Sequence, residues 1–210
     1  MTILALEFSS ARRSVALARG GVLLAEAGET GGRDTKAFAL IEQVLVAANV
    51  TREEIEVIAV GLGPGSYTGI RAAIAVAQGW QLARGTRLIG VSSVEALAAQ
   101  AQAAEIFGRV NVVVDAQRGE FYLAPWNISA AVRAEISPLQ IVTAAELAAR
   151  KNAGEICVGP AADIGLWPGA APLAQLASGR MDFVAGENLA PIYLRETSFV
   201  KAPPPKMGLT

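Results

Sequence analysis

Hydrophobic and polar positions follow two periods in the first half of the chain, and together they predict strands that alternate with helices. Runs that are apolar or alternate with period two predict strands at 3–8, 14–19, 22–28, 55–61 and 88–91. Helical spacing predicts helices at 34–48, at 68–84 and from Ser92 or Ser93 to about Ile106. Asp34 is a candidate N-cap, and it precedes a helical face of Phe38, Ile41, Leu45 and Ala48.

The second half repeats this order of elements. Strands are predicted at 110–115, 120–125, 130–137 and 156–159, and helices at 143–150 and 161–166, whereas 169–180 has no clear pattern. The order βββαβα thus occurs twice, with Glu7 and Asp115 ending the first strand of each copy. We therefore expect an α/β protein with two similar lobes that face a cleft. Domains are expected at 1–106 and 107–200, followed by a disordered tail at 201–210.

A loop with four glycines and one proline lies between Gly61 and Gly69 and leads into an alanine-rich helix. Such a loop is either a cradle for an anion or a tight packing joint. It lacks the Lys-Ser/Thr ending of a Walker loop, and Ser66 or Thr68 is a suitable helix cap. A stripe of small and apolar residues on the helix allows another helix to approach closely: Ile70, Ala73, Ile74, Ala77 and Gln78. Arg71 lies in the first turn, where a cation opposes the helix dipole.

Composition narrows the chemistry of this 210-residue chain. It contains no histidine, which excludes Ser-His-Asp and Cys-His catalysis and histidine-ligated zinc. The net charge of −1 gives no basic excess for binding nucleic acid, so any role near RNA would depend on a partner. Cys157 is the only cysteine, no apolar run reaches the ~20 residues of a membrane span, and the start of the chain does not resemble a signal peptide. A cytoplasmic protein is expected.

The doubled βββαβα order is the layout of actin-like, RNase H-like lobes of the ASKHA superfamily of ATPases and sugar kinases. Active members carry an acid, a glycine and a hydroxyl residue in the first hairpin, where this chain has Glu7-Phe8-Ser9-Ser10-Ala11. The glycine is missing, so we interpret the site as the vestige of a phosphate-binding loop. Its candidate residues are Glu7, Ser9, Ser10, Gly63, Gly65, Ser66 and Asp115.

Four segments resemble the bacterial TsaB (YeaZ) family across nearly the whole chain: LGPGSYTGIRAAIAVAQGWQLA, ILALEFSSARRSVALA, VVVDAQRGEFYLA and APIYLR. The Gly-Pro-Gly-Ser-Tyr-Thr-Gly-Ile-Arg motif is specific to that group. This chain departs from the family at two places. It has Glu7-Phe8-Ser9 where Asp-Thr-Ser is usual, and Arg33-Asp34-Thr35-Lys36 where a histidine-containing segment is usual.

The resemblance implies a non-catalytic subunit in the synthesis of threonylcarbamoyladenosine (t6A) on tRNA, with no catalytic or metal-binding residue of its own. It implies dimerisation with a TsaD-like catalytic subunit, cooperation with a TsaE-like ATPase, a homodimer in isolation and no membrane contact. Contact with tRNA, and any use of ATP or ADP with Mg²⁺, would belong to the complex. The expected partner interface comprises Ile70, Arg71, Ala73, Ile74, Ala77, Gln78 and Gln81, with Phe38 and Ile41 beside them.

Two enzymatic alternatives stay open at the level of the sequence. One is an ATPase or small-molecule kinase that uses Glu7, Ser9, Asp115 and the glycine-rich loop. The other is proteolysis by Ser66 or Ser9, which is disfavoured because the sequence shows no general base.

Overall fold

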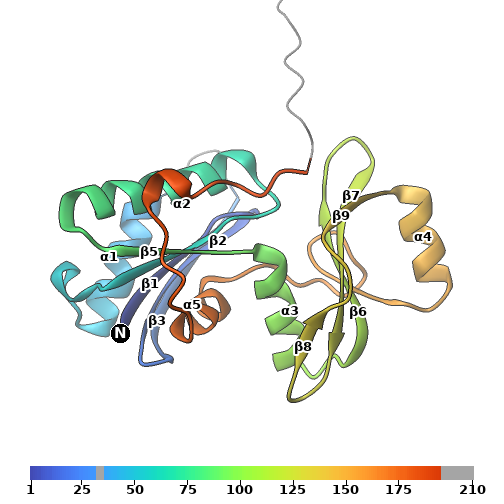
Figure 1. Ribbon diagram of the computed structural model, residues 1–210, viewed down its shortest axis with the longest axis horizontal. Coiled ribbons are helices and arrows are strands. Elements are labelled where there is room, and N and C mark those ends of the chain that lie inside the picture. Colours follow the sequence, from blue (N-terminus) through green and yellow to red (C-terminus); the bar gives the residue numbers. More distant parts are fainter. Residues whose placement is uncertain (32–35, 195–210) are drawn as a thin grey trace, which may run out of the picture.

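Two α/β lobes lie side by side in the computed structural model, which describes residues 1–31 and 36–194 (Figure 1). The proposed N-cap Asp34 and the expected tail at 201–210 lie outside these residues. Lys36 occupies the N-cap position of the first helix, and its side chain makes no capping hydrogen bond. Over the described residues, no helix is both long enough and apolar enough to cross a membrane.

The first lobe is built on a five-stranded sheet in the order β3-β2-β1-β4-β5. Its strands are β1 (Thr2–Glu7), β2 (Arg12–Arg19), β3 (Val22–Thr30), β4 (Val57–Gly61) and β5 (Arg87–Val91). β1 runs antiparallel to β2 and parallel to β4, which in turn runs parallel to β5. All five strands were predicted from the sequence to within about two residues. The chain reverses between β1 and β2 at the hairpin whose polar residues were singled out above.

Helices cover both faces of this first sheet (Figure 1). α1 (Ala37–Ala48) and α2 (Tyr67–Arg84) pack on one face, and α5 (Ala170–Ser178) packs on the other. Because successive strand residues point to opposite faces, Leu4 and Leu6 pack toward α1 and α2, whereas Ile3 and Ala5 pack toward α5. The face under α5 is rich in alanine, which lets that helix lie close to the sheet.

The second lobe has a smaller sheet in the order β10-β6-β7-β8, with β9 also paired to β7. Its strands are β6 (Gly108–Asp115), β7 (Glu120–Ile128), β8 (Arg133–Glu135), β9 (Gln140–Thr143) and β10 (Ile156–Val158). α3 (Ser93–Ala103) contacts β6, β7 and β8, and α4 (Ala144–Asn152) contacts β7 and β9. Short 3₁₀ turns occur at Arg52–Glu54 (η1) and Gly186–Asn188 (η2).

One helical prediction for the second half is wrong, and one helix was not predicted. Residues 161–166 form a turn and a bend in which Ile164 makes an isolated bridge to Val158, so this short segment pairs with a strand end instead of coiling. The unpatterned stretch 169–180 contains α5, whose buried residues Ala170, Leu173, Ala174 and Ala177 follow helical spacing. The domain boundary at 106 stays a prediction, and packing crosses it. α3 contributes to the core of the second lobe, and α5 to that of the first.

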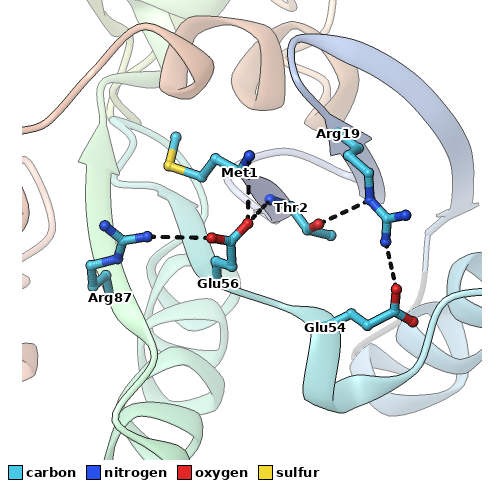
Figure 2. A network of polar contacts seen from close by, with 6 residues as sticks. All are labelled: Met1, Thr2, Arg19, Glu54, Glu56 and Arg87. Atoms are coloured by element: carbon cyan, nitrogen blue, oxygen red, sulfur yellow. Dashed lines mark hydrogen bonds and ion pairs between the residues drawn. The ribbon is translucent and has the colours of Figure 1, made fainter.

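Polar contacts fix the start of β1 (Figure 2). The Thr2 amide donates to Glu56 Oε2 at 2.6 Å, and the Met1 ammonium lies 3.5 Å from the same oxygen. Arg19 donates to Thr2 Oγ1 at 3.0 Å and to Glu54 at 2.8 Å. These contacts join β1, β2 and the segment around η1 at the end of the sheet opposite to the β1–β2 hairpin.

Candidate functional site

The glycine-rich loop packs with its backbone directly against the β1–β2 hairpin. The amide of Ser66 donates to the carbonyl of Ser9 at 2.6 Å. A Cβ on Gly65 would lie 2.0 Å from Ser9 O, and a Cβ on Gly69 would lie 2.0 Å from Phe8 O. Since both distances are far below van der Waals contact, only glycine fits at these two positions. The loop therefore forms the packing joint that was one of its two interpretations.

Several amide groups of the loop are used within the protein. Gly63 N donates to Ser93 Oγ at 3.1 Å, and Gly69 N donates to Ser66 Oγ at 3.3 Å. Ser66 is thus the N-cap of α2, as predicted, whereas Thr68 lies inside the helix. An anion cradle requires free N–H groups that converge on the ligand. In this loop, the amides of Gly63, Ser66 and Gly69 are already paired.

Glu7 is completely buried and does not line the cleft between the lobes. Its Oε1 accepts from Ser9 N and its Oε2 accepts from Ser93 Oγ, both at 2.8 Å. Burial raises the pKa of the Glu7 carboxyl, and the hydrogen bonds from Ser9 and Ser93 partly oppose that shift. Gly61 provides the space, because a Cβ there would lie 2.1 Å from Glu7 Oε2. The first candidate acid is therefore an internal structural group.

A cleft of about 800 Å³ opens between the two lobes. Five of the predicted phosphate-loop residues line it: Ser9, Ser10, Gly65, Ser66 and Asp115. Five further side chains that the sequence analysis did not single out line it as well: Arg13, Tyr67, Gln117, Tyr122 and Trp167. Gly63, like Glu7, lies outside its lining. The cleft thus presents hydroxyl groups, aromatic rings and an arginine, a mixture that suits small polar ligands.

Asp115, the second candidate acid, folds back on its own turn. Its Oδ1 accepts from Gln117 N at 2.7 Å, and its Oδ2 accepts from Gln117 Nε2 at 3.0 Å. Gln117 and Arg118 both have positive φ, 64° and 59°, which is the backbone of a tight hairpin turn. Among the described residues, no group of three or more acidic, cysteine or histidine side chains is placed to hold a metal ion.

The stripe on α2 that was predicted to meet a partner faces the protein's own core instead. Ile70, Ala73 and Ala77 are fully buried, and Ile74 is 6% exposed. Ile41 of α1 is buried in the same cluster. The four α2 residues are therefore core residues rather than exposed interface contacts, whereas Ile41 also lines the groove between α1 and α2. The small side chains let α2 lie close to its own sheet rather than to a second helix.

Three other predicted interface residues, Gln78, Gln81 and Arg71, make contacts within the protein. Gln78 Nε2 donates to Gly186 O at 2.8 Å, and Gln81 Oε1 accepts from Gly186 N at 2.7 Å, so both amides bind η2. Arg71 lies 4.4 Å over the ring of Tyr67, which stacks on Tyr193 at 5.5 Å. The Arg71 guanidinium in the first turn of α2 thus has the Tyr67 ring as a partner within the protein.

Phe38 is 70% exposed and borders a groove of about 450 Å³ between the outward sides of α1 and α2. The sequence analysis missed most of this groove, whose apolar lining includes Ala75, Val76, Gly79, Trp80 and Ala83. Ala75, Gly79 and Ala83 recur every four residues, and this spacing was the available signal. They form a second stripe of small residues on α2, which faces outward.

Two α/β lobes of this topology, with the first hairpin at the cleft between them, define a protein of the actin-like fold. A model of the family "TsaD: tRNA N6-adenosine threonylcarbamoyltransferase" matches residues 33–185. The chain belongs to this family, and within it to the TsaB (YeaZ) group.

Relatives and solved structures support this placement. The chain is 32% identical over 128 residues to "tRNA threonylcarbamoyladenosine biosynthesis protein TsaB" of Escherichia coli, a match that covers 60% of this chain and 55% of that protein. It is 28% identical over 148 residues to the Bacillus subtilis protein of the same name, covering 70% and 64%. The structure "YeaZ from Pseudomonas aeruginosa" superposes with a TM-score of 0.76 at 28% identity, covering 92% of this chain and 99% of that one. The matches thus span less than two thirds of either curated relative.

Proposed function

We propose that this chain is a non-catalytic partner subunit in the biosynthesis of t6A on tRNA. It dimerises with a TsaD-like catalytic subunit and works with a TsaE-like ATPase. The names of the Escherichia coli and Bacillus subtilis relatives support a place in this pathway. The net charge of −1 supports tRNA contact through the partner rather than through this chain alone.

The observation that carries the docking proposal is the exposed groove between α1 and α2. Phe38 at 70% exposure, Val46 at 72% and Leu82 at 90% place large apolar side chains on this helix pair. The outward stripe of Ala75, Gly79 and Ala83 gives a partner helix room for close approach. The occupant we propose is the corresponding helix pair of the TsaD-like subunit or, in isolation, of a second copy of this chain.

The alternative of an ATPase or kinase has less support from the geometry. Glu7 is enclosed by Gly61, Ser9 and Ser93, and both carboxylate oxygens of Asp115 bind Gln117. Both acids on which that chemistry would depend are thus engaged internally. We propose that this chain requires no cofactor of its own, and that ATP or ADP with Mg²⁺ acts in the complex. Calorimetric detection of Mg²⁺-dependent ATP binding by the isolated chain would revive the alternative.

The docking proposal is tested by placing a charge in the groove. Ala75→Glu and Phe38→Glu both change exposed positions, so the fold is expected to persist. Each variant should lose co-purification with the TsaD-like subunit and lower the t6A content of tRNA in complemented cells. By light scattering, each should be a monomer where the unmodified chain is a dimer. The matched control is Val132→Glu, which adds the same charge at a 58% exposed site on the second lobe. Normal co-purification of both groove variants would refute this docking surface.

A further inference from the structure

The buried carboxylate of Glu7 joins three segments that are distant in the sequence. Glu7 ends β1, Gly63 lies in the glycine-rich loop, and Ser93 is the first residue of α3. Ser93 Oγ donates to Glu7 Oε2 at 2.8 Å and accepts from Gly63 N at 3.1 Å. Ser93 N in turn donates to Gly63 O at 2.8 Å. The result is a continuous hydrogen-bonded chain in which each of the three residues contacts the next.

This chain of hydrogen bonds crosses from one lobe to the other. α3 follows β5 of the first sheet directly, and its buried Ala96 packs with α5 in the first lobe, whereas Val94, Leu97, Ala98 and Ala101 belong to the core of the second lobe. A contact that fixes the N-terminus of α3 therefore fixes one end of the second lobe. Glu7 belongs to the central strand of the first sheet, so its bond to Ser93 connects that strand with the helix that leads into the second lobe.

The chemistry of the contact explains why a charged group is tolerated there. A buried carboxylate is costly unless hydrogen-bond donors surround it, and an N-terminal helix position favours negative charge. Glu7 receives donors from Ser9 N and Ser93 Oγ. Gly61 leaves the required space, since a Cβ on it would lie 2.1 Å from Glu7 Oε2. Removing one donor leaves an unsatisfied buried oxygen, which makes the arrangement sensitive to small changes.

We propose that the Glu7–Ser93 contact is a conformational device that sets the orientation of the second lobe on the first. With the contact in place, the cleft between the lobes has one width. Without it, α3 pivots about the short connection from β5, and the lobes sample a range of orientations. The packing of Ala96 on α5 and the half-buried ion pair between Arg180 and Glu95, at 3.7 Å, limit that range without setting a single angle.

Two substitutions break the contact from opposite sides. Ser93→Ala removes the hydroxyl donor. Glu7→Asp keeps the negative charge and the possibility of accepting from Ser9 N two residues on, but it is one methylene too short to reach Ser93. Ser92→Ala is the matched control, because the neighbouring Ser92 hydroxyl makes only a 3.5 Å bond to Gly63 O and does not contact Glu7. Ser93→Ala is the smaller change, so it alone tests whether the contact sets the orientation of the lobes if Glu7→Asp does not fold.

The readout is the distance between spin labels at Val22→Cys and Val132→Cys, which are exposed sites on the first and second lobe. Native Cys157 is 3% exposed and stays unlabelled. We expect one narrow distribution for the parent and for Ser92→Ala. Ser93→Ala and Glu7→Asp should give a distribution roughly twofold broader, or one with a shifted mean, as the lobes populate further orientations. Distributions that match the control, even with a lowered melting temperature, would overturn the proposal and leave Glu7 with a local role in stability.

Discussion

Two glycines of α2 allow the packing joint to be tested by one substitution with opposite expected outcomes. A Cβ on Gly69 would lie 2.0 Å from Phe8 O and 3.1 Å from Phe8 C, whereas a Cβ on Gly79 would meet nothing within 4 Å. Neither glycine has a positive φ, so alanine is compatible with the backbone angles of both. Gly69→Ala and Gly79→Ala thus differ mainly in the space available to one methyl group.

The expected magnitudes follow from those distances. Alanine in place of a helical glycine stabilises the folded state by about 0.5–1 kcal/mol, and Gly79→Ala should show this gain in full. At Gly69 the same gain is opposed by an overlap with backbone, where overpacking costs about 1–3 kcal/mol or more. We expect net destabilisation of about 1–2 kcal/mol, which lowers the melting temperature of a chain of this size by about 2–8 °C. Gly79→Ala should raise it by about 1–4 °C.

Urea unfolding followed by circular dichroism gives the free energy of unfolding for each variant, and an unchanged m-value shows that the comparison is valid. If Gly69→Ala stabilises the protein as much as Gly79→Ala, the hairpin does not press on the loop, and the packing joint is refuted. Gly79 also lines the groove between α1 and α2. Gly79→Ala is therefore expected to weaken both co-purification with the TsaD-like subunit and dimerisation of the isolated chain, while it stabilises the folded monomer, so unfolding is measured at a concentration at which the chain is monomeric.

Three further predictions concern polar and aromatic contacts. Burial raises the pKa of Glu7 above its ordinary value of 4.5, so the folded state binds the Glu7 proton more tightly than the unfolded state does. The free energy of unfolding should therefore fall as the pH rises from the unfolded-state pKa through the folded-state pKa. Glu7→Gln should flatten this slope, measured by urea unfolding at several pH values. Glu56→Gln weakens the contacts at the start of β1 and should cost less than about 1 kcal/mol, an effect that shrinks at high salt. Tyr193→Ala removes the ring stacked on Tyr67 and should speed proteolytic cleavage after residue 189, with unchanged cleavage contradicting this.

The elements that the sequence predicted well are those in which burial is continuous or strictly periodic. β1 and β4 are buried at every position, so their apolar runs identify central strands. α5 was missed although its buried residues follow helical spacing, and it contains Pro172 and lies between Gly169 and Gly179. Proline is tolerated in the first turn of a helix, where its missing N–H has no partner to lose.

The candidate site was predicted less well, because its geometry depends on contacts between distant residues. The sequence places Glu7 at the end of a strand but does not show that Gly61 makes room for it or that Ser93 lies opposite. α2 carries two stripes of small residues, and composition alone does not decide which of them faces the sheet. The branched side chains Ile70 and Ile74 decide it, since they fill the core while Ala75 and Gly79 stay outside.

The glycines of the loop explain how one motif serves packing and, on our proposal, partner binding. Gly61, Gly65 and Gly69 each lie against a different residue of the β1–β2 hairpin, namely Glu7, Ser9 and Phe8. Spaced four residues apart, they let the end of β4, the loop and the first turn of α2 lie against the hairpin. A helix positioned by its own backbone needs no side chain on its outer surface to hold it in place. The outward stripe of Ala75, Gly79 and Ala83 is therefore not needed to hold α2 in place and is available for contact with a partner. Substitutions in this stripe should change partner binding without changing the fold.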